Sequence, residues 1–468
     1  MKKMSRGAFE DMKGFVRVAE TLLEITILTL AYYVVWMNGY NLEYFAYKGK
    51  YVLMGVYAVL LYALFLNSDC TMFGQLHRVD LMIGQVISIF LVNIITYLQL
   101  CLIANGVLPI GPMMALTGAD IVIAILLIFL YTNLYHRLYA PHDMLLVYGH
   151  RRGVELKIKM DTRKDKYNIS GLISSDEGFD KIVREIPKYD AVILNDVPSP
   201  LRNDLLKFCY RYRVRTYVSP KLTDIMLRGA RNITLFDTPL LLVKGTGLTP
   251  AERVAKRTMD ILLSAIVLLI LSPLMLLIAA AIKLEDGGPV FFRQKRLTRN
   301  GREFDILKFR SMVVDAEKYA GAVLATDNDP RITRVGRIIR PFRLDELPQL
   351  INILKGDMSI VGPRPEIPCY VEQFRDEIPL YMIRHRVKPG ITGYAQVNGL
   401  RGDTSIEKRI EYDLWYIENW SLQLDMKILL MTVFGGMVND ETLALAAGSM
   451  NEKDGGELHE SDEHQRGA

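Results

Sequence analysis

The stretch Ile261–Ile282, with the sequence ILLSAIVLLILSPLMLLIAAAI, decides how this chain of 468 residues meets a membrane. It is long enough to cross a bilayer, which takes about 20 apolar residues. Basic residues flank both ends, with Lys256 and Arg257 before the stretch and Lys283 and Arg293 after it. Because basic flanks favour the cytoplasmic side, this pattern places both ends of the stretch on the same side of the membrane.

Ser272 and Pro273 stand in the middle of this stretch. Proline removes a backbone donor and clashes with the carbonyl four residues earlier, which kinks or breaks a helix. A broken helix that enters one leaflet and returns satisfies both the proline and the basic flanks, and the serine can bond a freed backbone group. We therefore predict a re-entrant membrane helix over residues 256–283. An ordinary kinked span is the alternative.

Four further apolar segments occupy the first third of the chain. Half of all residues are hydrophobic, which is a high share for a soluble protein. Basic residues precede the first segment and follow the fourth, so both ends are expected in the cytoplasm. We predict a four-helix transmembrane bundle over residues 1–140, with Glu20 and Glu24 at the membrane interface. The segments are Val18–Met37, Tyr51–Leu66, Leu81–Ala104 and Met113–Tyr135.

Residues 141–248 have a different pattern, in which short apolar strands alternate with helical stretches. Such alternation predicts a Rossmann-like α/β domain with a parallel sheet. Gly149 and Gly153 follow the first strand with GxxxG spacing, which lacks the middle glycine of a dinucleotide fingerprint. We expect a regulatory or structural domain. The expected strands are Met144–Tyr148, Ile169–Ile173, Ala191–Leu194, Thr216–Val218 and Leu240–Val243.

Two smaller features complete the organisation. The four cysteines have no paired spacing and the histidines form no ligand motif, so neither a disulfide framework nor a zinc site is expected. Residues 446–468 are polar and mixed in charge, and we expect them to form a disordered tail.

The stretch Arg340–Leu350, RPFRLDELPQL, sets Asp345 and Glu346 side by side among arginines. One interpretation is structural, because acidic residues stabilise a helix N-terminus and apolar residues recur at helical spacing from Leu347 to Leu354. The region 293–402 is densely basic. Such charges suit phosphate groups, since arginine offers a bidentate fork and lysine a point charge. They also suit anionic lipid headgroups. No RNA-binding motif is present, so nucleic acid is not an expected partner.

The carboxylate pair has a chemical interpretation as well. A carboxylate between cations near a helix N-terminus should stay ionised. An ionised Asp345 can attack phosphorus and form an acyl phosphate, while Glu346 binds Mg²⁺. A glycosidase fits poorly, because its two carboxyls stand about 5 Å or more apart across the scissile bond. An aspartyl-phosphate phosphatase also fits poorly, since no second acidic motif of that type is present.

Five motifs follow one another in the C-terminal part of the chain. They are KRTMDILLSAIVLLILSPLMLLIAAAIKLEDGGPVFFRQKRLTRNGREFDILKFRSM, DPRITRVGRIIR, LDELPQLINILKGDMSIVGPRPE, VKPGITGYAQVNGLRGDT and EYDLWYIENWSLQLD. In this order they resemble the bacterial sugar transferase family of monotopic polyprenyl-phosphate hexose-1-phosphate transferases. The whole chain resembles the large members of the family, which place four membrane helices and a Rossmann-like domain first. The resemblance implies a mainly α catalytic domain over residues 249–445, including the re-entrant helix.

The resemblance also implies a reaction. Hexose-1-phosphate would pass from a UDP-sugar, with glucose or galactose favoured, to undecaprenyl phosphate, and UMP would leave. Asp345 would be the nucleophile and Glu346 the Mg²⁺ ligand or its close partner. This is the first membrane step of exopolysaccharide, capsule or O-antigen synthesis. The alternative is a non-catalytic membrane scaffold that recruits polysaccharide-assembly proteins.

Further site residues follow from the matched motifs. One departure from the family pattern is Phe342 and Arg343 before LDELPQ, where Thr-Ser or a similar pair is frequent. The change adds a cation and leaves the nucleophile intact. The implied phosphate-binding residues are Lys308, Arg310, Arg340 and Arg364, and those on the sugar and uridine side are Asn398, Arg401 and Asp425.

The resemblance finally implies a cellular setting. The chain would be a multi-pass protein of the bacterial inner membrane, in contact with membrane lipids and with its soluble domains in the cytoplasm. A homodimer and association with downstream glycosyltransferases are compatible with this architecture.

Overall fold

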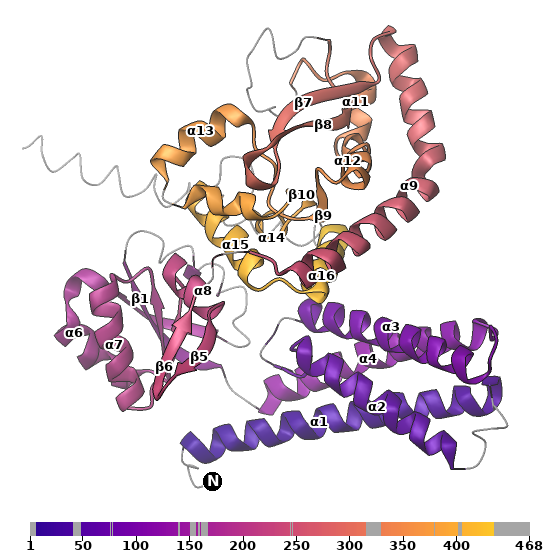
Figure 1. The fold of residues 1–468 in the computed structure, drawn as a ribbon. Coiled ribbons are helices and arrows are strands. Elements are labelled where there is room, and N and C mark those ends of the chain that lie inside the picture. Colours follow the sequence, from indigo (N-terminus) through magenta and orange to yellow (C-terminus); the bar gives the residue numbers. More distant parts are fainter. Residues whose placement is uncertain are drawn as a thin grey trace, which may run out of the picture. The chain divides into compact units, whose positions relative to one another are not determined.

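The computed structural model forms two compact units, Met1–Ser219 and Pro220–Ala468. They divide ahead of the boundary predicted at residue 248. Figure 1 shows the order of the elements along the chain. The predicted tail over residues 446–468 and Arg401 lie outside the described residues. The described residues are 6–40, 48–74, 76, 78–138, 141–149, 156–157, 160, 167–243, 245, 247–314, 329–378, 380–400 and 405–434.

The first unit opens with four long helices. Helix α1 packs against α2 and α4, and α3 packs against the same two helices. Among the described residues, five helices are long and apolar enough to cross a membrane, namely these four and α9 of the second unit. They indicate a membrane-associated protein. The four helices are α1 (Arg6–Val35, continued by a π-helical turn at Trp36–Tyr40), α2 (Gly49–Asn67), α3 (Arg78–Ile103) and α4 (Gly111–Leu138).

Buried polar side chains join these four helices. The Tyr57 hydroxyl lies 2.9 Å from Asn93 Oδ1 and 2.9 Å from Asp120 Oδ2, which links α2, α3 and α4. Gln85 of α3 donates to Glu24 of α1 at 3.1 Å. Hydrogen bonds of this kind hold helices together where no water competes. Glu20 and Glu24, expected at a membrane interface, are both buried among the helices.

A parallel sheet follows, as the alternating pattern predicts. Its strand order is β2-β1-β3-β4, and every neighbouring pair is parallel. An added Cβ at Gly149 would collide with the Asp196 carbonyl, so this glycine allows the loops after β1 and β3 to approach each other. The elements are β1 (His142–Tyr148), β2 (Tyr167–Ser174), α6 (Phe179–Glu185), β3 (Ala191–Asn195), α7 (Ser199–Arg211) and β4 (Arg215–Val218).

One predicted strand belongs to a different sheet. Residues Leu240–Val243 do not join the parallel sheet, because β6 (Thr238–Leu242) pairs antiparallel with β5 (Arg231–Leu235) as a separate hairpin. Only Phe236 and Asp237 separate the two strands, which suits a tight hairpin. The preceding helix α8 (Leu222–Arg228) buries Ile225 in the core of the second unit.

Over its described residues, the second unit combines short helices with three two-stranded sheets. Its main core includes Ile353, Met358, Val361, Leu414 and Ile428. Besides α8 and the β5–β6 hairpin, the unit contains α9 (Pro250–Asp286), β7 (Phe291–Leu297), β8 (Glu303–Phe309), α11 (Arg334–Ile339), the 3₁₀ turn η6 (Leu344–Glu346), α12 (Gln349–Lys355), β9 (Ser359–Val361), α13 (Pro368–Glu377), the 3₁₀ helix η7 (Tyr381–Arg386), β10 (Gly390–Thr392), α14 (Tyr394–Val397), α15 (Ile406–Glu418) and α16 (Leu422–Phe434).

Helix α9 is the longest element and is bent (Figure 1). Thr249 and Glu252 close its N-terminus as a capping box, and Gly287 ends it in the left-handed conformation. Pro273 cannot donate to the Leu269 carbonyl, and Ser272 Oγ donates to that carbonyl instead, at 2.9 Å. The hydroxyl thus satisfies the acceptor that the proline leaves free, as the sequence led us to expect.

The N-terminal end of α9 is bound to the body of the second unit. Lys256 Nζ lies 2.6 Å from Asp425 Oδ2, and both side chains are buried. Arg257 donates to the last carbonyls of α12, which carry the negative end of that helix dipole. Asp260 accepts from Ser359 Oγ and from the Ile360 amide, each at 3.0 Å.

The C-terminal end of α9 is bound to the same body. The Glu285 carboxylate accepts from the Arg334 amide at 2.7 Å and from the Val335 amide at 3.3 Å, and it thereby caps α11. Asp286 pairs with the buried guanidinium of Arg310. The apolar residues between the two ends, such as Leu269, Ile270, Leu276 and Leu277, are exposed.

Candidate active site

The β7–β8 hairpin forms one wall of the candidate active site, and its register sets Phe292 opposite Lys308. Asn352 of α12 holds this hairpin. Its Oδ1 accepts from the Leu307 amide at 2.9 Å, and its Nδ2 donates to the Asp305 carbonyl at 2.8 Å. The side-chain amide therefore pairs with the free edge of β8 as a further strand would. Sequence reasoning missed Asn352, because an asparagine within a helix carries no sign of such a contact.

Asp345 and Glu346 lie in the 3₁₀ turn η6. One interpretation of the sequence places them at a helix N-terminus; the turn that holds them is a 3₁₀ turn, and α12 starts after it, at Gln349. Arg343 precedes η6 in the left-handed conformation, with φ 54°, which is uncommon for a residue with a side chain. This residue turns the chain immediately before the two carboxyls and sets the direction in which they emerge.

Glu346 is the centre of a charged cluster. Its Oε1 lies 2.8 Å from Lys308 Nζ and 3.6 Å from Arg364 Nη2. Lys308 and Arg340 line a pocket of about 420 Å³ together with Asp345. The structure therefore brings the predicted carboxyl pair and three of the predicted cations into one site.

Burial and charge act in opposite directions on the two carboxyls. Burial raises the pKa of Asp345 above its ordinary value, and the nearby cations Lys308 and Arg340 offset this only in part. Burial would also raise the pKa of Glu346, but the attraction of Lys308 and Arg364 outweighs it and holds this pKa below its ordinary value. The expectation that cations alone keep Asp345 ionised therefore neglects the cost of burying its charge.

The remaining predicted phosphate ligand and one predicted sugar-side residue have partners of their own. Arg310 lines the same pocket, but it is buried and its guanidinium pairs with Asp286. The Asn398 side chain donates to the Tyr394 carbonyl at 2.7 Å, at the end of α14. Asn398 is not among the residues that line the pocket of Asp345.

Asp425 is fully buried at the start of α16. Besides its ion pair with Lys256, it accepts from the Tyr416 hydroxyl at 2.7 Å and from Trp420 Nε1 at 3.0 Å. These contacts fasten α9 to α15 and α16. The structure therefore does not bring Asp425 into the pocket of Asp345.

Arg384 is a buried residue that sequence reasoning missed. It lies 3.0 Å from Asp413 and 3.4 Å from Glu366, and its Nη2 donates to the Arg364 carbonyl at 3.1 Å. These contacts fix the GPRPE loop that carries Arg364 toward Glu346. Arg384 is therefore a positioning residue. In the sequence it is one of several arginines in a basic run, and nothing there distinguishes it from a surface cation.

The donor set of the site fits a single Mg²⁺ ion. No cluster of three or more Asp, Glu, His or Cys side chains suited to a metal occurs within the part of the chain that the structure describes. Mg²⁺ nevertheless needs only one or two carboxylates, because water and phosphate oxygens fill its other positions. Both ion pairs of Glu346 use Oε1, which leaves Oε2 and the Asp345 carboxyl as oxygen donors.

Comparison with known proteins covers the part of the chain that holds this site. The profile of the bacterial sugar transferase family matches residues 251–439, which include the pocket and α9. A UDP-glucose:undecaprenyl-phosphate glucose-1-phosphate transferase of Caulobacter vibrioides is 46% identical over 204 residues, which are 42% of this chain and 75% of that protein. The chain therefore belongs to the bacterial sugar transferase family.

Two longer relatives bear names of the same kind. A UDP-glucose:undecaprenyl-phosphate glucose-1-phosphate transferase of Escherichia coli is 48% identical over 217 residues, or 46% of this chain and 45% of that protein. A UDP-N-acetylgalactosamine-undecaprenyl-phosphate N-acetylgalactosaminephosphotransferase of Aeromonas hydrophila is 51% identical over 252 residues, or 53% of this chain and 58% of that protein. The chain thus aligns with about half the length of these relatives.

The buried pair of Lys256 and Asp425 predicts a stability defect. Asp425→Asn leaves a buried ammonium without a charge partner, and we expect a loss of about 3–5 kcal/mol in the free energy of unfolding. The measurement is thermal unfolding followed by circular dichroism, with Asp376→Asn on the exposed side of α13 as the matched control. Lys256→Met/Asp425→Asn should recover much of the loss, because no buried ammonium is left and the asparagine oxygen can still accept from Tyr416 or Trp420. A stable Asp425→Asn variant with an altered sugar preference would instead support the role that the resemblance implied.

His385 predicts a pH dependence of stability. Burial, together with the adjacent Arg384, lowers the pKa of His385 to about 4. Since the folded state favours the neutral ring, the stabilisation is complete above the ordinary pKa of about 6.5 and is lost as the pH falls toward 4. We expect His385→Gln to reduce the loss of unfolding free energy between pH 7 and pH 4.5, by at most ~3 kcal/mol. Fluorescence of Trp415 and Trp420 reports the transition; parallel pH curves for the two proteins would contradict the assignment.

Proposed function

We propose that this protein transfers hexose-1-phosphate from a UDP-sugar to undecaprenyl phosphate and releases UMP. The observation that carries the proposal is the site in which Asp345, Lys308 and Arg340 line one pocket, while the adjoining Glu346 pairs with Lys308 and Arg364. The names of the relatives support the same reaction, since each is a transferase acting on undecaprenyl phosphate.

Asp345 is proposed as the nucleophile. A carboxylate oxygen of Asp345 attacks the phosphorus next to the sugar, and the bond from this phosphorus to the oxygen of UMP breaks. The electron pair leaves with UMP, and the hexose phosphate is held on Asp345. An oxygen of undecaprenyl phosphate then attacks the same phosphorus, which frees the carboxylate and forms undecaprenyl-diphospho-hexose. The partial burial of Asp345 favours this chemistry, because a poorly hydrated carboxylate is a stronger nucleophile.

The cations and Glu346 have supporting roles. Lys308, Arg340 and Arg364 bind the diphosphate and stabilise charge on its oxygens as the bond to UMP breaks. Glu346 and Asp345 would hold Mg²⁺, which neutralises phosphate charge and lowers the repulsion between substrate and nucleophile. Lys308 serves both carboxyls, since it pairs with Glu346 and attracts Asp345.

Helix α9 is proposed to enter and leave the membrane on one side. Both of its ends bind the same compact unit, while the residues between them expose an apolar surface. A helix that crossed the bilayer would separate its ends by about 30 Å of hydrocarbon and could not anchor both of them to one soluble body. The bend at Pro273 and the hydroxyl of Ser272 make the return possible without an unsatisfied carbonyl.

The proposal also covers the roles of the N-terminal domains and the identity of the hexose. The four N-terminal helices would form a transmembrane bundle in the bacterial inner membrane, and the Rossmann-like domain would act in the cytoplasm as a regulatory or structural part. Glucose or galactose is the proposed hexose. Relatives named for glucose and for N-acetylgalactosamine are similarly close, at 48% and 51% identity, so the test needs all three sugars.

The reaction predicts UMP release that depends on Asp345. The purified full chain is incubated with undecaprenyl phosphate, Mg²⁺ and UDP-glucose, UDP-galactose or UDP-N-acetylgalactosamine, and nucleotide is measured. We expect UMP with one preferred sugar, loss of UMP on chelation with EDTA, and a fall of at least about a thousandfold in Asp345→Asn. Asp376→Asn on α13 is the matched control and should keep full activity.

Other outcomes of this assay have definite meanings. Release of UDP would mean ordinary glycosyl transfer and would contradict the proposed attack by Asp345. A folded Asp345→Asn variant with full activity would exclude this residue as the nucleophile. No nucleotide release with any of the three sugars would favour the scaffold hypothesis.

The proposed topology of α9 predicts labelling from one side. In a chain whose four cysteines are replaced by alanine, single cysteines replace Val254 and Leu284, which are both exposed near the ends of α9. We expect a membrane-impermeant maleimide to label both in inverted vesicles and neither in intact spheroplasts. A cysteine at Val107, between α3 and α4, controls for the opposite side. Labelling of the two α9 positions from opposite sides would establish a fifth span.

A further inference from the structure

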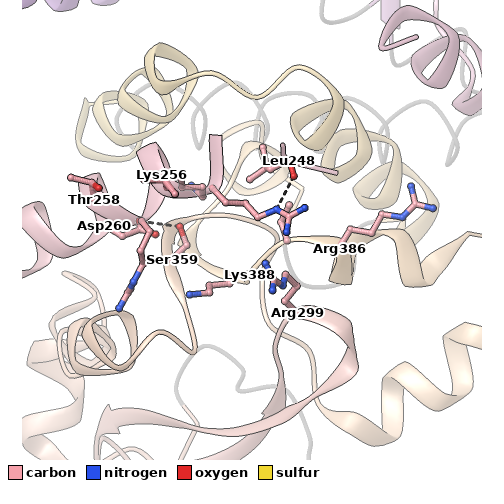
Figure 2. A pocket seen from close by; sticks show the side chains of 12 residues that line it. Leu248, Lys256, Thr258, Asp260, Arg299, Ser359, Arg386 and Lys388 are labelled. Carbon is pink, nitrogen blue, oxygen red and sulfur yellow. Dashed lines mark hydrogen bonds between the residues drawn. The ribbon is translucent and has the colours of Figure 1, made fainter. Parts of the chain in front are cut away.

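A second pocket of the same unit lies beside the N-terminal end of α9, and its volume is about 390 Å³ (Figure 2). It shares no lining residue with the pocket of Asp345. Its walls come from α9, from the loop before α9 and from the segments around Arg299, Ser359 and Lys388. The proposed transfer reaction makes no use of this pocket.

The charge of the second pocket is strongly positive. Six cationic side chains line it, whereas Asp260 is its one carboxylate among the described residues. Asp425 neutralises Lys256. Asp260 accepts hydrogen bonds from Ser359 and from the Ile360 amide. Glu418 attracts Arg386, so four cations remain for the cavity, and these are Arg253, Arg257, Arg299 and Lys388.

Backbone carbonyls hold two of these arginines in place. Arg253 Nε donates to the Leu248 carbonyl at 2.8 Å. Arg257 donates to the carbonyls of Ile353 and Leu354, at 2.5 and 2.8 Å. Carbonyl bonds orient a guanidinium without cancelling its full charge, so both arginines stay cationic toward a ligand.

Lys388 is crowded by like charge. It makes no ion pair within the described part of the chain, although Asp260 and Asp357 are near enough to attract it. Its Nζ and Arg257 Nη2 each lie 3.5 Å from the point where a Cβ on Gly356 would stand. Burial, together with Arg257 and Arg299, lowers the pKa of Lys388. An anion in this cavity would relieve the repulsion between these cations.

We propose that the second pocket binds a phosphate group. Arginine forks and a lysine point charge are the donors that phosphate oxygens prefer. The exposed side chain of Val254 lines the pocket, and the exposed apolar surface of α9 continues from Ile261 and Leu262. A membrane lipid fits the pocket and the adjoining apolar surface best. Its acyl chains would cover the apolar surface, while its headgroup phosphate would enter the pocket. Inorganic or nucleotide phosphate is the second source of the same chemistry.

The test uses the full chain in nonionic detergent. Native mass spectrometry measures binding of dioleoylphosphatidylglycerol, with dioleoylglycerol as the lipid that lacks phosphate. We expect stoichiometric binding of the phospholipid alone. Arg299→Gln/Lys388→Gln should weaken it roughly five- to thirtyfold, because each cation near a membrane surface contributes on the order of a few-fold. Arg375→Gln on the exposed side of α13 is the matched control and should bind as the natural chain does.

The arms of the experiment separate the two sources. Binding that survives 10-fold excess inorganic phosphate over lipid assigns the pocket to a lipid headgroup, whereas displacement by inorganic phosphate or UMP assigns it to a soluble ligand. If the double variant does not fold, Arg299→Gln and Lys388→Arg are measured separately, and only the first should lose affinity. Equal phospholipid binding by the double variant, the control and the natural chain would overturn the proposal.

Discussion

The pairing of charged groups at both ends of α9 is the constraint on which the second unit depends. Some apolar residues of α9, such as Ile278 and Ile282, pack in the cores of the unit, and the polar groups at both ends of the helix have partners on the same body. Lys256 and Asp260 find them in α16 and β9, and Glu285 finds them in the amides of α11. Because these partners come from segments far apart in the sequence, one helix determines where several short elements must lie. The small cores of the unit then fill the space between them.

The candidate active site follows from the same arrangement. Arg257 of α9 holds the C-terminal end of α12, and Asn352 of α12 holds β8. The turn with Asp345 and Glu346 precedes α12, so its place opposite Lys308 is set by the two contacts together. Burial and nearby charge have opposite effects on the pKa values of the two carboxyls, so that of Asp345 is raised and that of Glu346 is lowered. Adjacent residues can therefore have different roles.

Much of this could be predicted from the sequence. The apolar segments, four strands of the parallel sheet and the meeting of Lys308, Arg340 and Arg364 with the carboxyl pair follow from periodicity or from the family motifs. Asp425 could not be placed in this way. Its partner Lys256 is 169 residues away, and a carboxyl within a motif has the same letter whether it faces a cavity or a buried lysine. The roles of Arg384 and Asn352 could not be predicted for the same reason, since both depend on contacts between segments that are far apart in the sequence.

The cap that Glu285 places on α11 links α9 to the candidate active site. Helix α11 has six residues and is therefore about 9 Å long, and Arg340 follows its last turn. Helix α9 is thus joined to one end of α11, and the residue that follows the other end is a cation of the pocket. The place of Arg340 in the pocket of Asp345 is therefore tied to the C-terminal end of α9, whereas Lys308 is held by the β7–β8 hairpin and Asn352.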